Sequence, residues 1–142
     1  MKKGIDYIGV GIGAVIVDKD GKMLLSQRGP KAKNERGKWE FPGGGVEFGD
    51  TMEATIKREM KEELGIDITT YEQLPVLDHI LKEEGQHWIT SGFISRIKKG
   101  KPTIKEPEKC SALGWFTLSE MGKMDLSVPT KAYMKILKKI GY

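Results

Sequence analysis

The spacing of apolar residues changes along the chain, and each period predicts a different element. Met52, Ile56, Met60 and Leu64 recur at four-residue steps, the period of a helix that buries one face. Gly65 follows the last of them, in the position where glycine commonly ends a helix. We therefore predict a helix that docks through one apolar stripe and leaves its other side to polar residues.

Alternating apolar and polar or glycine positions predict strands on both sides of this helix. Five segments alternate in this way: residues 7–17, 22–28, 66–81, 87–97 and 113–116. The first two are predicted to pair as a hairpin about the turn Asp18–Gly21. The third and fourth are predicted to pair antiparallel and to turn near Gly85.

The C-terminal part of the chain returns to a helical period. Ser127 precedes a segment in which Tyr133, Ile136, Leu137 and Ile140 form an apolar stripe with lysines on the opposite face. Strands on either side of one helix, together with a second terminal helix, predict an α/β fold. We expect an α/β/α sandwich with a mixed β-sheet between helices.

Length and composition are those of one globular unit. The chain has 142 residues, of which 38% are hydrophobic, so we expect a single domain over residues 1–142. No apolar run reaches membrane-spanning length, and the N-terminal residues have no signal-peptide core. Cys110 is the only cysteine, which excludes an intrachain disulfide. We expect a cytoplasmic protein that does not bind a membrane.

The positive charge is spread along the chain. The formal net charge is +4, and lysines occur throughout the sequence. Four basic residues lie in the loop 29–38, where they either face solvent or meet the phosphates of an anionic substrate. No basic groove interleaved with aromatic residues is present, so we do not expect a nucleic acid polymer as partner.

Three carboxylates are concentrated on the predicted central helix. Glu59, Glu62 and Glu63 stand at i, i+3 and i+4, where like charges repel. Arg58 is spaced to pair with Glu62 but leaves two carboxylates over. A bound divalent cation would offset the repulsion, whereas the plain alternative is a solvated acidic face.

The ligand types favour Mg²⁺, with Mn²⁺ possible, over zinc. Clustered carboxylate oxygens suit hard cations, and the chain has no Cys/His set for zinc. His79 and His87 have no partner histidine at ligand spacing, so both are predicted to be structural. The turn Gly43–Gly45 leads into the helix, and Asp50 is its predicted N-cap, with Glu53 completing a capping box.

These residues resemble the Nudix box, whose pattern is Gx5Ex7REUxEExGU with U an apolar residue. The matching positions are Gly44, Asp50 in place of glutamate, Arg58-Glu59-Met60, Glu62-Glu63 and Gly65-Ile66. The resemblance implies the Nudix fold and cation-dependent hydrolysis of a phosphoanhydride bond. The substitution at Asp50 puts only the outer part of the site in doubt.

The resemblance also implies roles for the box residues. Glu59 and Glu63 are expected to be the principal metal ligands, with the carbonyl of Gly43 completing the shell. Glu62 is expected to be a ligand or the general base, and Arg58 to orient a glutamate. A loop acid, Glu106 or more specifically Glu108, is a further candidate ligand. The choice of general base stays open among Glu62, Glu63 and Glu108.

Substrate contacts are expected outside the helix. By resemblance, Arg28 lies near the phosphates and Gly44 borders the substrate. Glu40 is a candidate acceptor for the amino edge of a base. Phe41 and Trp88 either stack on that base or pack in the core.

The sequence most resembles MutT-like enzymes, which release pyrophosphate from a nucleoside triphosphate. Hydrolysis of nucleoside diphosphate-linked substrates such as ADP-ribose or nucleotide sugars is the first alternative, although Leu81 stands where a marker proline would be expected for ADP-ribose. A nucleotide-binding regulatory domain without turnover is the second, disfavoured because Glu59, Glu62 and Glu63 are all present. A homodimer is possible, as in related proteins.

Overall fold

Two β-sheets form the middle of the molecule. The computed structural model describes residues 1–142. The first sheet consists, in order, of β4 (Gly43–Gly45), β1 (Gly9–Ile16), β6 (Gln86–Lys99) and β5 (Asp67–Leu81). Its β1 and β6 are parallel and its other neighbours are antiparallel. The second sheet is antiparallel and consists of β3 (Trp39–Glu40), β2 (Met23–Arg28) and β7 (Cys110–Phe116).

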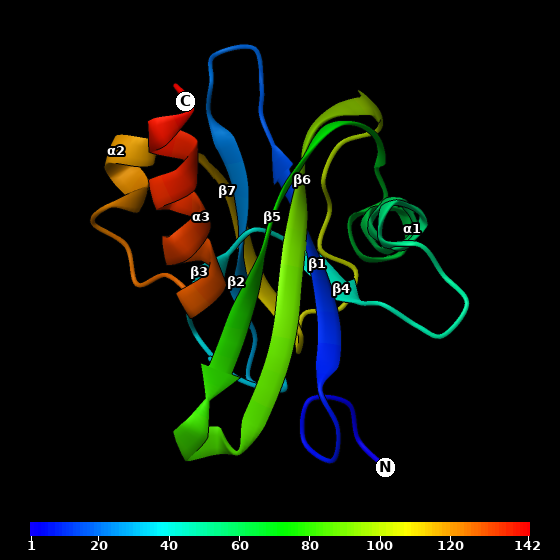
Figure 1. The fold of residues 1–142 in the computed structure, drawn as a ribbon. Coiled ribbons are helices and arrows are strands. Elements are labelled where there is room, and N and C mark those ends of the chain that lie inside the picture. The colour runs from blue at the N-terminus through cyan, green and yellow to red at the C-terminus, as the bar shows by residue number, and fades with distance from the viewer.

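Helices cover the sheets on both sides. The helix α1 (Met52–Leu64) lies on one side, and α2 (Leu118–Met121) and α3 (Val128–Lys139) lie on the other (Figure 1). A short 3₁₀ turn, η1 (Lys82–Glu84), joins β5 to β6. The predicted α/β/α sandwich is confirmed, but the strands between the helices are divided into two sheets. None of the helices is long and apolar enough to cross a lipid bilayer.

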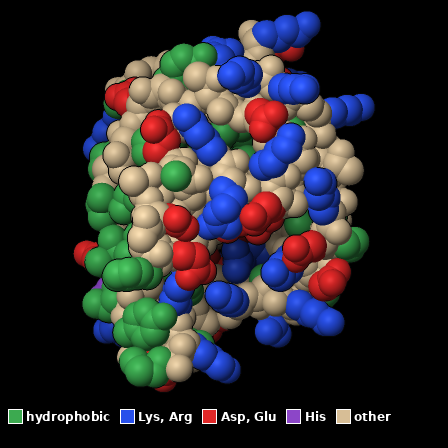
Figure 2. Space-filling view, turned by 90° about the vertical axis from the view of Figure 1, so that its right-hand side faces the viewer, with side chains coloured by type: hydrophobic (Ala, Val, Ile, Leu, Met, Phe, Trp, Pro, Cys, Tyr) green, Lys and Arg blue, Asp and Glu red, His purple; other side chains and the backbone are tan.

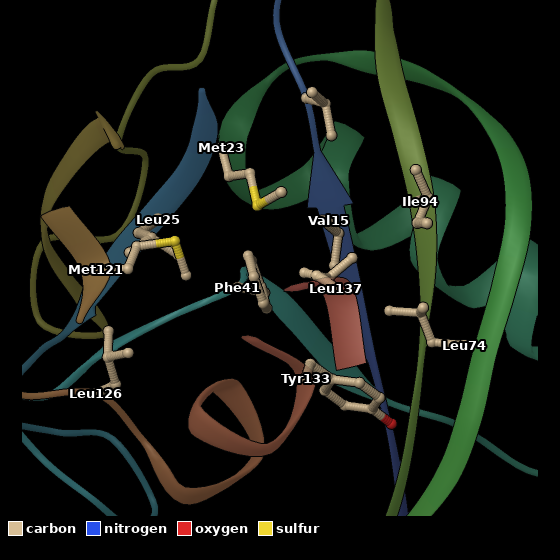
Figure 3. Close-up of a cluster of buried hydrophobic side chains, with 11 residues drawn as sticks. Val15, Met23, Leu25, Phe41, Leu74, Ile94, Met121, Leu126, Tyr133 and Leu137 are labelled. Atoms are coloured by element: carbon tan, nitrogen blue, oxygen red, sulfur yellow. The ribbon is translucent and has the colours of Figure 1, made fainter. Parts of the chain in front are cut away.

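Two hydrophobic clusters hold the helices against the strands. One cluster packs α2 and α3 against β1 and β2 and includes Phe41, Tyr133 and Leu137 (Figure 3). The other packs α1 against β1 through fully buried side chains such as Ile56 and Met60. Burial of each such side chain stabilises the fold by about 2 kcal/mol. The opposite face of α1 is thereby fixed relative to the sheet.

The predicted hairpin between β1 and β2 is wrong. The turn forms as expected, because the Asp18 carboxylate accepts hydrogen bonds from the backbone N–H groups of Asp20 and Lys22 at 2.9 and 2.8 Å. Beyond one bridge between Val17 and Met23, however, the two strands separate into different sheets. Both strands bury side chains on two faces, as expected for interior strands of two sheets rather than for the two strands of one hairpin.

The predicted hairpin of β5 and β6 is confirmed, with its turn at η1 and Gly85. The chemistry of proline suggests a break in the strand at Pro75, but β5 continues through this residue. The ladder shifts register between Leu74 and Leu77 and continues. The freed carbonyl of Pro75 accepts a hydrogen bond of 2.9 Å from the Tyr133 hydroxyl, which docks α3 onto this strand.

Both long helices depart at one end from the sequence prediction. Thr51, not Asp50, caps α1, because its hydroxyl accepts a hydrogen bond of 3.0 Å from the N–H of Ala54. Gly65 ends α1 in the left-handed conformation at φ +71°, as predicted. In α3 the buried stripe stops at Leu137, since Ile140 lies past the end of the helix and is 48% exposed.

Candidate active site

The glycines Gly43–Gly45, predicted to form a turn, instead form strand β4, which pairs with β1 and lies against the carboxylates of α1. A Cβ atom on Gly44 would lie 2.5 Å from Cδ of Glu59, so the absence of a side chain lets that carboxyl group rest against the β4 backbone. A Cβ on Gly43 would lie 2.0 Å from the carbonyl oxygen of Ile12 in β1. The two glycines therefore allow two separate close approaches.

Glu59 and Glu63 form the electrostatic centre of the site. They stand one turn apart on α1, and the Glu59 side chain is only 15% exposed. Burial, a hydrogen bond to Glu59 and the negative charges of Glu59, Glu40 and Glu106 raise the pKa of Glu63 to about 8. Glu63 therefore keeps its proton near neutral pH, next to the negative charge of Glu59. A divalent cation offsets the same repulsion with more charge, so the donor set fits a hard cation.

Glu62 lies at the exposed edge of this group. It stands three residues from Glu59, where helix side chains are neighbours, and about 100° around the helix axis from Glu63. Glu62 is 60% exposed and its carboxylate pairs with Arg58 at 3.2 Å. Arg58 also contacts Glu59 at 3.3 Å and Asp50 at 3.8 Å. No group of three or more His, Cys, Asp or Glu side chains gathers at metal-ligand spacing.

Arg28 and Glu40 form a second charged pair beside the carboxylates. Nη1 of Arg28 donates to both oxygens of Glu40, at 2.9 and 2.8 Å, across the neighbouring strands β2 and β3. Burial raises the pKa of Glu40 and the charge of Arg28 opposes that rise. Glu40 in turn raises the pKa of Glu63, which places the pair next to α1.

The face that carries α1 mixes acidic and basic side chains, with the acids gathered around a hollow (Figure 2).

The sequence matches the model of the NUDIX domain over residues 8–135. The chain belongs to the Nudix family. This is a family of hydrolases that act on phosphoanhydride bonds and generally use divalent metal ions.

Several named Nudix proteins are similar to this chain. It is 46% identical over 59 residues to the CTP pyrophosphohydrolase of Escherichia coli, covering 42% of this chain and 43% of that one. It is 39% identical over 79 residues to the 8-oxo-dGTP diphosphatase of Proteus vulgaris, covering 56% and 67%. The chain thus spans less than half of the first relative's length and about two thirds of the second's.

Solved structures agree with the Nudix fold. The MutT Nudix hydrolase of Burkholderia pseudomallei superposes with a TM-score of 0.81 at 37% identity, over 89% of this chain and 95% of that one. A MutT protein from Methanosarcina mazei superposes with a TM-score of 0.78 over 97% of both chains, at 21% identity. The second likeness shows the fold alone.

Two aromatic residues of this Nudix chain are buried rather than placed for base stacking. Phe41 is 6% exposed and lies within the cluster of α2 and α3 (Figure 3). Trp88 is 8% exposed; its ring occupies the space left by Gly4 and Gly9, and its Nε1–H donates to Gln86. The packing interpretation holds for both, because neither ring presents a free face.

Two loop acids, Glu106 and Glu108, lie before β7, and both are exposed. The charge of Glu106 acts on Glu63, and its carboxylate pairs with Lys109 at 3.1 Å. Glu108 is exposed and holds the loop through its backbone carbonyl, which accepts from the N–H of Lys31 at 2.9 Å. Glu108 stays a candidate ligand, and the charge of Glu106 acts on Glu63.

Sequence reasoning missed Lys109. A hydrogen bond to Glu106 and its charge raise the pKa of Lys109, and Glu63 and Glu59 add smaller contributions. The positive charge of a lysine in the loop before β7 therefore acts on the Nudix carboxylates. Its spacing of three residues from Glu106 was the available signal, but nothing local placed that loop beside α1.

The raised pKa of Glu63 predicts how stability varies with pH in metal-free protein. The folded state keeps a proton up to about pH 8, whereas the unfolded chain loses it near the ordinary value of 4.5. Stability therefore falls as pH rises from about 5 to 8, by up to about 5 kcal/mol and by on the order of 10 °C in Tm. Thermal unfolding in EDTA at several pH values measures this loss. Glu63→Gln should flatten the curve, and an equally steep fall in that variant would contradict the assignment.

Proposed function

We propose that this chain is a Mg²⁺-dependent Nudix pyrophosphohydrolase that converts a nucleoside triphosphate to a nucleoside monophosphate and pyrophosphate. The observation that carries the proposal is the Glu59–Glu63 pair, held against Gly44 of β4 so that its repulsion is relieved only by a proton or a cation. Mn²⁺ has similar ligand preferences and is the second candidate ion.

The chain's own residues supply the positions that this chemistry needs. A polyphosphate resists water because its oxygens are negatively charged, and a bound Mg²⁺ neutralises them and acidifies the attacking water. Glu59 and Glu63 would hold the ion, with the carbonyl of Gly43 beside them. Arg58 keeps Glu59 in place through their 3.3 Å contact. Arg28 would bring a positive charge to the phosphates.

The substrates for which two relatives are named support a triphosphate substrate. Two relatives with high identity are named for CTP and for 8-oxo-dGTP, both nucleoside triphosphates. A second candidate is a nucleoside diphosphate-linked substrate. It is favoured by 31% identity over 84% of this chain to the ADP-ribose pyrophosphatase of Methanocaldococcus jannaschii, of which 70% is covered.

Product analysis with a nucleotide panel tests the proposal. Purified protein with Mg²⁺ is incubated with the common and oxidised nucleoside triphosphates, ADP-ribose and nucleotide sugars, and the products are separated by ion-exchange chromatography. We expect pyrophosphate and a monophosphate from one or more triphosphates, and no product in EDTA. Two monophosphates from a linked diphosphate would support the second candidate instead. Tight binding without any product would contradict the enzymatic proposal.

A further inference from the structure

The loop between β2 and β3, residues 29–38, is fixed by two consecutive side chains that point into the protein. We call it the anchor loop. Asn34 is 8% exposed, and its Nδ2 donates to Oε1 of Gln86 in β6 at 2.8 Å. The Glu35 side chain is 5% exposed, and its Oε1 accepts from the N–H of Val128 at the start of α3 at 3.0 Å. The loop is thus tied to both a strand and a helix.

Glu35 also faces a buried histidine. Its Oε2 lies 3.5 Å from Nε2 of His79 in β5, whose side chain is 7% exposed. At this distance the contact is electrostatic rather than a well-formed hydrogen bond. Burial would raise the pKa of Glu35, but His79 and the N–H of Val128 outweigh it, and the pKa lies below its ordinary value. The carboxylate is therefore held charged inside the protein.

The backbone of Glu35 is strained. Its φ of +44° is the only positive value at a residue other than glycine in this chain. Such conformations persist where surrounding contacts fix them, and they concentrate at functional sites. A glycine would adopt this backbone without strain. The presence of glutamate indicates that its side-chain contacts outweigh the conformational cost.

The anchored backbone reaches the candidate active site through Arg28. The carbonyl oxygen of Asn34 accepts a hydrogen bond of 2.7 Å from Nε of Arg28. Nη1 of the same guanidinium binds both oxygens of Glu40. These contacts orient the planar group from two sides and leave Nη2 without a protein hydrogen bond. The negative charge of Glu35 also raises the pKa of Glu40. The buried contacts of Glu35 and the Arg28–Glu40 ion pair are therefore coupled electrostatically.

We propose that Glu35 and His79 are positioning residues for substrate binding: they hold the Asn34 carbonyl where it orients Arg28 against Glu40. The kinetic part of this inference rests on the proposed function, but the orientation of Arg28 does not. Neither residue touches the substrate in this proposal. Each acts through the anchor loop.

The kinetic test compares Glu35→Gly in two backgrounds. Glycine keeps the left-handed backbone and removes only the anchored carboxylate, so we expect KM for the nucleotide to rise roughly tenfold with kcat changed less than about threefold. In the Arg28→Lys background the same change should alter KM less than about twofold, because the group it orients is gone. An equal rise in both backgrounds, or no rise in either, would overturn the proposal.

Three further variants separate positioning from general loss of structure. Glu35→Gln retains an acceptor for the N–H of Val128 and should restore most of the wild-type KM. Glu83→Gly removes an exposed glutamate from η1 and should leave KM unchanged. His79→Leu provides the second test should Glu35→Gly fail to fold. We expect it to raise KM only where Arg28 is present, and an effect independent of Arg28 would count against positioning.

An NMR measurement tests the geometry without any catalysis. The Nε–H signal of Arg28 is assigned by its absence from Arg28→Lys. In wild-type protein its hydrogen bond to Asn34 should slow exchange with water, and in Glu35→Gly that protection should fall at least tenfold. Unchanged protection would refute the inference. A protein that hydrolyses no nucleotide but shows this loss would refute the proposed function and leave the positioning role intact.

Discussion

Glu63→Gln is expected to lower kcat by roughly a thousandfold while the protein stays folded. The amide has the same shape but cannot supply the negative charge that binds a divalent cation. In the metal-free protein Glu63 already holds a proton near neutral pH, so the neutral amide suits its buried position. Steady-state hydrolysis of the preferred triphosphate at saturating Mg²⁺ measures the loss, and Tm in EDTA should be equal to or above that of wild type.

A matched substitution on the same helix provides the control. Glu53 lies in the first turn of α1, away from the Glu59–Glu63 pair, and accepts a hydrogen bond from the Thr70 hydroxyl. Glu53→Gln makes the same change of charge, and its amide oxygen still accepts that bond. We expect its kcat to stay within about twofold of wild type. Wild-type turnover in Glu63→Gln would show that the carboxylate pair takes no part in the reaction.

The Nudix helix was the most predictable part of the fold because its signals are local. The four-residue repeat from Met52 to Leu64 and the terminal Gly65 specify an amphipathic helix without any other part of the chain. The error was a single residue at the N-cap, where Asp50 and Thr51 are both good capping residues. Arg58 lies 3.8 Å from Asp50 and gives that carboxylate another partner. The local sequence does not separate these two equivalent caps.

The candidate site was less predictable where it depends on strand pairing. The sequence marked Arg28 and Glu40 separately as substrate contacts, but β2 and β3 are neighbours and bring the two side chains together as an ion pair. The alternation that predicted β1 and β2 contains nothing that separates a hairpin from two central strands of different sheets. Phe41 and Trp88 show the same limit of sequence-based prediction. An aromatic residue beside a polar motif gives the same sequence pattern whether it binds a base or fills the core.

The contacts of the anchor loop leave no trace in local sequence. Glu35 and His79 are far apart in the chain, and the loop composition is that of a solvated basic segment. Only the fold shows that Asn34 and Glu35 point inward between charged neighbours. The positive φ of Glu35 is equally invisible, since turn propensities would place glycine there.

Gly44→Ala is expected to lower kcat by roughly a hundredfold with little change in Tm. The new Cβ would lie 2.5 Å from Cδ and 2.8 Å from Oε2 of Glu59, so the carboxylate must move. Because the atoms displaced are the end of a flexible side chain, the cost falls on the position of the ligand rather than on the fold. Kinetics with a Mg²⁺ titration should show weaker dependence on the ion together with the lower kcat.

The flanking glycines separate this effect from loss of structure. A Cβ on Gly45 would meet nothing closer than Nζ of Lys3 at 3.7 Å, an ordinary contact, so Gly45→Ala should keep nearly wild-type kcat and Tm. A Cβ on Gly43 would lie 2.0 Å from the Ile12 carbonyl oxygen, so Gly43→Ala must displace backbone and should lower Tm. Three adjacent alanine substitutions thus predict three outcomes. Equal loss of kcat in all three, or none in Gly44→Ala, would mean that contact with β4 does not position Glu59 for the reaction.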